Sequence, residues 1–147
     1  IEPVDIVKYD HLPLKETDEW GLLMRKDCSL ASKEVIRPED IQGIPLILPQ
    51  RIGLQRELSA WSGIAAEHLN TIATFDILFN NPSLLIKNGL GYAFALRTLV
   101  DTSESPTLCF RPLEPAIKIQ YGLAWKRYPI FSKAADKFIE QLKELLE

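Results

Sequence analysis

The chain has 147 residues, of which 46% are apolar and 25% are charged, and its formal net charge is −3. These values fit one globular domain or a lobe and a half of a larger one, and they exclude a disordered chain, because enough apolar side chains are present to form a core. No apolar run approaches the roughly 20 residues that span a bilayer. Basic residues are dispersed, and the densest cluster is Lys126–Arg127, so we expect this chain alone not to bind DNA.

The start of the chain and its two cysteines indicate where the protein comes from and in which compartment it folds. The chain opens with Ile1 instead of methionine and shows no secretory signal, so we expect a part excised from a longer protein. Cys28 and Cys109 lack CxxC spacing. This favours free thiols in a reducing compartment over a redox pair.

The N-terminal third predicts two extended segments and a short helix. Lys8–Leu14 is short and bounded by proline, and Trp20–Lys26 is a compact apolar run typical of a strand. Arg37–Gly43 has the punctuation of a helix, with Pro38 at its first position and Gly43 as its stop.

The next segment, Ile44–Leu48, is apolar on both faces and predicts an interior strand covered on both sides, with Pro45 near its start. A helix follows, because apolar residues recur at i, i+4 and i+7 from Leu54, and it ends at Ser62 or Gly63. The side chains expected in one sheet core are Trp20, Leu46, Ile47, Leu48, Ile72 and Phe94.

The middle of the chain predicts a strand, a helix and another strand. Leu69–Phe75 is rich in β-branched residues. Asn81 is a cap candidate with Pro82 at the first helical position and Gly89 after the last. The preceding Asp76–Phe79 is either a loop or an earlier turn of that helix. Leu90–Leu96 then reads as a short buried strand.

A polar loop over 101–107 leads to two last strands and a final helix. The strands are expected within LCFRPL and KIQYGLAWK, and Ser132 is expected to cap the helix. The apolar stripe of that helix comprises Ala135, Phe138, Ile139, Leu142, Leu145 and Leu146.

Alternating strands and helices with short loops predict an α/β sheet with crossover helices. Ligands of such sheets bind at the carboxyl ends of strands, beside helix N-termini. Pro49–Gly53 is such a place, with polar Gln50 and Arg51 and with Gly53 permitting close backbone approach. The alternative is that these are solvated loop residues that serve only the turn.

No catalytic motif is present. The sequence contains no phosphate-binding loop, no GxGxxG opening a helix, no HExxH and no GxSxG. His11 and His68 are far apart, and each is interpreted as a surface residue. We therefore favour a binding module over an enzyme, and we expect no cofactor and no metal.

Five segments, in order, carry a family resemblance. They are Asp27–Ala31, Asp40–Ile47, Gly89–Leu96, Trp125–Arg127 and Ser132–Ile139. Together they resemble the effector-binding domain of LysR-type transcriptional regulators over nearly the whole chain. Two residues depart from that pattern: Cys28 stands where proline or histidine is common, and Arg97 stands where proline often follows the glycine-containing strand.

The resemblance implies a fold class: α/β, like a type 2 periplasmic binding protein, with two α/β lobes joined by two crossover strands. By that match residues 1–18 belong to the first lobe, residues 19–120 form a complete second lobe, and residues 121–147 return to the first lobe with a C-terminal helix. The start of the first lobe and an N-terminal helix-turn-helix would be missing. The effector-binding residues implied are Pro49, Gln50, Arg51, Ile52, Gly53 and Leu54, with Ile1, Glu2 and Pro3 across the cleft.

The function implied is sensing of a small molecule by a cytoplasmic transcription regulator that forms a homodimer or homotetramer, has no membrane partner and contacts DNA only through the missing domain. Arg51 beside a helix N-terminus favours an anionic effector. A solute-binding protein or an enzyme fragment of the same fold is the alternative, and a truncated fragment without function is a third.

Overall fold

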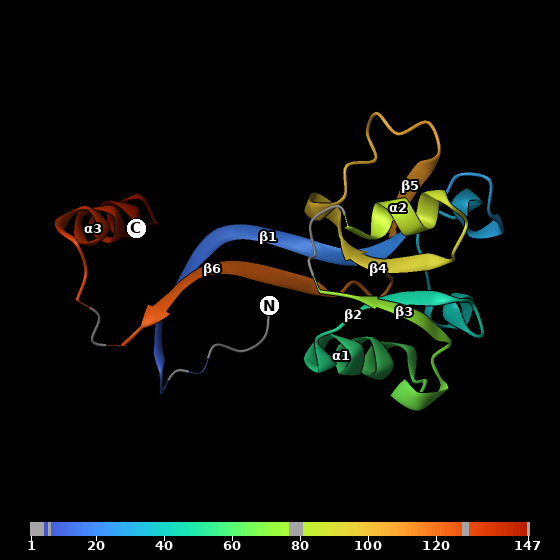
Figure 1. The fold of residues 1–147 in the computed structure, drawn as a ribbon, viewed down its shortest axis with the longest axis horizontal. Coiled ribbons are helices and arrows are strands. Elements are labelled where there is room, and N and C mark those ends of the chain that lie inside the picture. Colours follow the sequence, from blue (N-terminus) through green and yellow to red (C-terminus); the bar gives the residue numbers. More distant parts are fainter. Residues whose placement is uncertain (1–4, 6, 77–80, 128–129, 147) are drawn as a thin grey trace. The chain divides into compact units, whose positions relative to one another are not determined.

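The computed structural model describes residues 5, 7–76, 81–127 and 130–146. It divides into two compact units (Figure 1). The core unit is Asp18–Lys118, and the terminal unit combines Ile1–Thr17 with Ile119–Glu147. Two strands run through both units, β1 (Tyr9–Arg25) and β6 (Lys118–Lys126).

In the described part of the chain, six strands form one mixed sheet in the order β3-β2-β4-β1-β5, with β6 paired to β1. β2 is parallel to both β3 and β4, whereas β1 is antiparallel to β4 and β5. This confirms the expected α/β alternation around β2, and it adds a central antiparallel strand. The remaining strands are β2 (Leu46–Pro49), β3 (Thr71–Phe75), β4 (Tyr92–Leu96) and β5 (Leu108–Pro112).

Among the described residues there are three α-helices and four 3-10 turns; all lie between strands except α3, which follows β6. The helices are α1 (Ile52–Ser62), α2 (Asn81–Lys87) and α3 (Lys133–Leu146), and the turns are η1 (Ser29–Ser32), η2 (Pro38–Ile41), η3 (Ala66–His68) and η4 (Arg97–Leu99). The stop of α1 is confirmed, because Gly63 is left-handed (φ 70°) and its N–H donates to the Ser59 carbonyl at 3.0 Å.

The helix expected over Arg37–Gly43 is only a short 3-10 turn. It begins at Pro38, as predicted, and Gly43 follows it with φ 74°. The cap expected from Asn81 and an earlier turn over Asp76–Phe79 concern side chains or residues outside those described.

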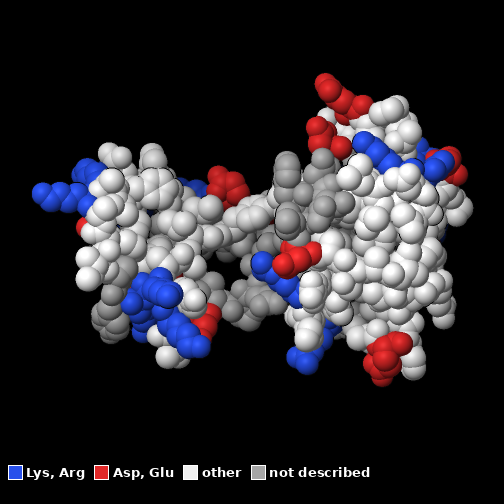
Figure 2. All heavy atoms as spheres, viewed as in Figure 1, with Lys and Arg blue, Asp and Glu red and all other residues white. Residues whose placement is uncertain are grey.

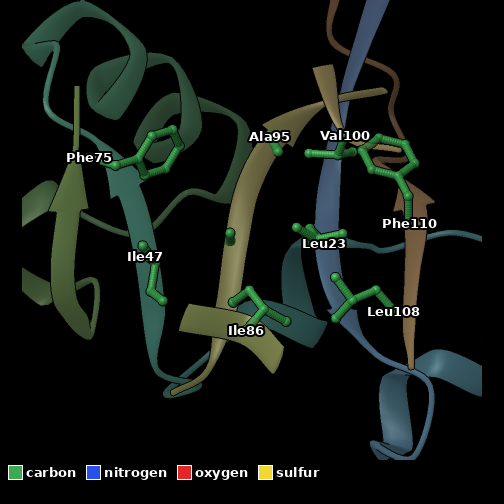
Figure 3. Close-up of a cluster of buried hydrophobic side chains, with 9 residues drawn as sticks. Leu23, Ile47, Phe75, Ile86, Ala95, Val100, Leu108 and Phe110 are labelled. Atoms are coloured by element: carbon green, nitrogen blue, oxygen red, sulfur yellow. The ribbon is translucent and has the colours of Figure 1, made fainter. Parts of the chain in front are cut away.

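Both faces of the core unit are packed. On one face, Ile86 of α2 lies over strand residues such as Leu23 and Ile47 in a cluster shown in Figure 3. On the other face, by the alternation of strand side chains, Leu46 and Leu48 point toward α1; α1 buries Leu54 and Leu58, and Figure 1 shows α1 and α2 on opposite sides of the sheet. The interior position of β2 is therefore confirmed.

Two sequence predictions are wrong in detail. Ile72 is 46% exposed, because β3 is an edge strand and the β2–β3 register shifts between Leu46 and Ile47, which leaves Ile72 without a partner. Lys8–Leu14 and Trp20–Lys26 are not separate segments but parts of the single 17-residue strand β1. Pro13 is tolerated inside it because, among the described residues, that half of β1 pairs only with β6 and has a free edge for the missing N–H.

The terminal unit differs from the core unit in burial. Every buried hydrophobic side chain among the described residues lies between Trp20 and Leu113. Helix α3 is capped as expected, since the Ser132 hydroxyl accepts a hydrogen bond from the Ala135 N–H at 3.3 Å, but its Phe138 is 58% exposed and its Leu145 is 78% exposed. No helix in the described part of the chain is long and apolar enough to cross a membrane.

Candidate functional site

One edge of the core-unit sheet collects the ends of several strands. The parallel strands β2, β3 and β4 all finish there. Since β1 is antiparallel to β4 and Trp20 pairs with Leu96, the residues that lead into this part of β1 lie at the same edge. The segments after β2 and β4 and the segment before Trp20 are therefore brought together from three distant parts of the sequence.

The loop from β2 into α1 is held by backbone hydrogen bonds. The Gln50 N–H donates to the Phe75 carbonyl at 2.8 Å, which extends the parallel pairing one residue beyond the strand. The Gln55 side-chain amide donates to the Pro49 carbonyl at 2.8 Å. Arg51 is extended (φ −66°, ψ 119°), and its carbonyl accepts the Leu54 N–H at 3.1 Å, which starts the helix.

The expected site residues divide into buried supports and exposed groups. Pro49 and Leu54 are buried and anchor the loop. The four residues between them, Gln50, Arg51, Ile52 and Gly53, are exposed. Ile1, Glu2 and Pro3 lie outside the described residues, so their expected place across a cleft stays a prediction.

The electrostatics of the loop favour a negative ligand. Arg51 makes no ion pair with any acidic residue in the described part of the chain, and it precedes the first turn of α1, whose N–H groups carry partial positive charge. On the face shown in Figure 2, lysine and arginine side chains occur in separate groups and form no continuous basic stripe. This arrangement suits a small anion better than a polyanion.

Sequence reasoning missed a second set of polar residues at this edge. Asp18 is buried, with 5% exposure, and its carboxylate accepts hydrogen bonds from the N–H and hydroxyl of Thr98. Glu19 pairs with Arg97 at 2.7 Å. The available signal was that Arg97 and Thr98 follow the LGYAFAL strand as Gln50 and Arg51 follow LILP.

The described residues of the core unit also line hollows along β5 that do not include the loop residues. One, of about 430 Å³, is lined by Lys26, Ala31, Thr102, Leu108, Cys109, Phe110 and Arg111. Another, of about 390 Å³, includes Lys33, Arg97 and Arg111. The Arg111 guanidinium is occupied by the carbonyls of Ala31 and Lys33, and burial raises the pKa of the Cys109 thiol.

No group of three or more histidine, cysteine or acidic side chains suited to hold a metal ion occurs among the described residues.

The comparison with protein families decides the class of the chain. Residues 2–147 match the model of the LysR substrate binding domain. The chain belongs to this family. The resemblance noted in the sequence is thereby confirmed, and the family is one of transcription regulators and not of enzymes.

Solved LysR regulators share the fold at low sequence identity. HinK from Pseudomonas aeruginosa is 15% identical (TM-score 0.71), over 94% of this chain and 49% of HinK. The CcmR regulatory domain of Synechocystis PCC6803, solved with 2-PG, is 17% identical (TM-score 0.71), over 99% of this chain and 71% of that domain. The effector-binding domain of QuiR, solved with shikimate, is 17% identical (TM-score 0.73), over 95% and 65%. The chain thus spans about half of HinK, and a search among curated proteins found no match.

These likenesses establish a mixed α/β fold of the LysR regulatory-domain type, which is periplasmic-binding-protein-like.

Proposed function

We propose that this LysR-type domain senses a small anionic effector at the β2–α1 loop, in a cleft between two lobes, and thereby controls DNA binding by the whole regulator. The single observation that carries the proposal is the exposed Gln50–Gly53 loop at the carboxyl edge of the sheet, in a chain that belongs to this family. The QuiR and CcmR domains, each solved with a small molecule, support a small-molecule effector.

Burial supports the inferred division into lobes. The core unit holds all the buried hydrophobic side chains of the described residues, which supports a complete second lobe over residues 19–120. Residues 1–18 and 121–147 would then belong to a first lobe that needs further chain to cover α3. The regulator would act in the cytoplasm as a homodimer or homotetramer, with DNA contacts made by a separate domain.

A binding titration with matched variants tests the proposal. The probes are shikimate, inorganic sulfate and inorganic phosphate, titrated calorimetrically into the wild-type chain, Arg51→Ala and Arg56→Ala. Both variants remove one exposed arginine, but Arg56 lies farther along α1. Arg51→Ala should weaken a bound anion by about 1.5–3 kcal/mol, the size of a charged hydrogen bond, whereas Arg56→Ala should bind like the wild type.

A steric variant tests the same loop without changing charge. Gly53→Val places a branched side chain at the second residue of α1, where it should block close approach of a ligand. Folding should be retained, because valine is a better helix former than glycine and the position is exposed. Equal loss of affinity in Arg51→Ala and Arg56→Ala, or full affinity in Gly53→Val, would refute the site.

A further inference from the structure

Asp18 is a buried carboxylate on β1, outside the β2–α1 loop. It is one of two buried polar residues among those described. Its oxygens accept hydrogen bonds from the Glu19 N–H at 2.7 Å, from the Thr98 N–H at 3.2 Å and from the Thr98 hydroxyl. A buried carboxylate held by several donors restrains the segments that carry the donors.

The next residue makes a second attachment to the same turn. Glu19 Oε1 accepts a hydrogen bond from Arg97 Nε at 2.7 Å, and Arg97 Nη2 lies 2.7 Å from the same oxygen in an ion pair. The Arg97 guanidinium also lies over the Phe110 ring, 5.1 Å from its centroid, which limits its freedom. Two consecutive residues of β1 thus hold two consecutive residues of η4; we call Asp18, Glu19, Arg97 and Thr98 the acid clamp.

The acid clamp lies where β1 enters the core unit. Asp18 is the first residue of the core unit, and the N-terminal segment of the terminal unit ends at Thr17 on the same strand. The described pairing of β1 with β4 starts only at Trp20, opposite Leu96. The acid clamp therefore fixes the two residues of β1 that precede the ladder, at the sheet edge where the β2–α1 loop also lies.

We propose that Asp18 and Glu19 are positioning residues of the effector site, which keep β1 rigid from Asp18 onward and join it to that edge. This inference rests on the proposed function. An effector shifts a conformational equilibrium only through a difference in interaction between states. If the start of β1 were frayed, small displacements of the sheet edge would not be transmitted along the strand. When Asp18 and Glu19 are held, such displacements are transmitted along β1 toward the terminal unit.

Amide-resolved hydrogen exchange by NMR of the whole chain tests the acid clamp without any ligand. The variants are Thr98→Val and Arg97→Gln, because removing the buried Asp18 would leave donors unpaired and risk unfolding. The reporter is the Trp20 N–H, which is bonded to the Ile117 carbonyl at 2.9 Å and is touched by neither substitution. Its exchange should become about tenfold faster in each variant, as expected for a local opening.

Two references separate positioning from general stability. The Leu46 N–H, bonded to the Asn70 carbonyl at 2.8 Å, reports on the interior of the sheet and should be unchanged. Asp27→Asn removes the exposed ion pair with Arg25 at the other end of β1 and should leave Trp20 unchanged. Unaltered Trp20 exchange, or equal acceleration of Trp20 and Leu46, would overturn the inference.

Binding titrations test separately whether the acid clamp affects the effector site. For any of the three probes that binds the wild type, Thr98→Val and Arg97→Gln should weaken binding about threefold, as distant coupled residues do. Unchanged affinity in both variants would refute the positioning role. If none of the probes binds, the proposed function fails on that result, whereas the exchange measurement still decides whether the acid clamp exists.

Discussion

The carbonyl oxygen of Pro45 lies 2.4 Å from the point where a Cβ on residue 91 would stand. Gly91 has φ 130°, and the neighbouring Tyr92 N–H donates to that same carbonyl at 2.9 Å. The second glycine of NGLG therefore lets β4 begin directly against the segment that leads into β2. This contact fixes the parallel β2–β4 pair that ends at the candidate site.

Gly91→Ala should destabilise the chain by roughly 2–4 kcal/mol, because it combines an unfavourable positive φ with a clash against backbone. Urea unfolding measures the change. Gly43→Ala is the control, since Gly43 also has positive φ but has no atom within 4 Å of the added Cβ; it should cost about 1–2 kcal/mol. Equal losses would show that the Pro45 contact has no role.

Leu48→Ala should cost roughly 2–5 kcal/mol, as truncation of a buried leucine does, because Leu48 is 1% exposed on the interior strand β2. Ile72→Ala, on the neighbouring edge strand, is the comparison. Ile72 is 46% exposed, so its truncation should cost less than about 1 kcal/mol. If urea unfolding shows a larger loss of stability for Ile72→Ala than for Leu48→Ala, the interior strand has been misplaced.

Asp40 should make stability depend on acid pH. Its side chain is 8% exposed; burial by itself raises the pKa of the Asp40 carboxyl, but hydrogen bonds from the Lys33 ammonium and the Arg37 N–H outweigh it and lower that pKa. Because the pKa of Asp40 is lower in the folded state, the ionised carboxylate stabilises the fold fully above the unfolded pKa of about 3.9. This stabilisation is lost as the pH falls through the pKa of the folded state.

The measurement is the unfolding free energy of the wild type and of Asp40→Asn from pH 7 to pH 3. The wild type should be the more stable at pH 7, and the difference should shrink below about pH 5. Parallel curves over this range would contradict the assignment.

The isolated chain should not bind duplex DNA at ordinary salt. Its net charge is −3, and Figure 2 shows no continuous basic stripe on the face drawn, whereas DNA binding depends on phosphate neutralisation by clustered lysine and arginine. A gel shift with specific and random duplexes checks this. Sub-micromolar binding would contradict it.

Local patterns in the sequence predicted the part of the fold that carries the site. Apolar residues on both faces of Ile44–Leu48 indicated an interior strand, and the spacing from Leu54 with Gly63 as a stop indicated α1. The exposure of Ile72 was missed because it depends on which strand is at the edge, and this is set by pairing between distant segments.

The contacts of Asp18 and Glu19 could not be read from the sequence either. They join β1 to residues about 80 positions later, and nothing in the local DEWG pattern indicates a partner. Pairing of this kind appears only once the order of the strands is known.

The most direct test of the central claim is a chemical-shift map of the ¹⁵N-labelled chain titrated with shikimate, sulfate and phosphate. If the β2–α1 loop binds the effector, the largest shifts should fall on the amides of Gln50, Arg51, Ile52 and Gly53, and Arg51→Ala should reduce them. Largest shifts at Cys109 and Arg111, in the hollow along β5, with the loop amides unmoved, would contradict the account.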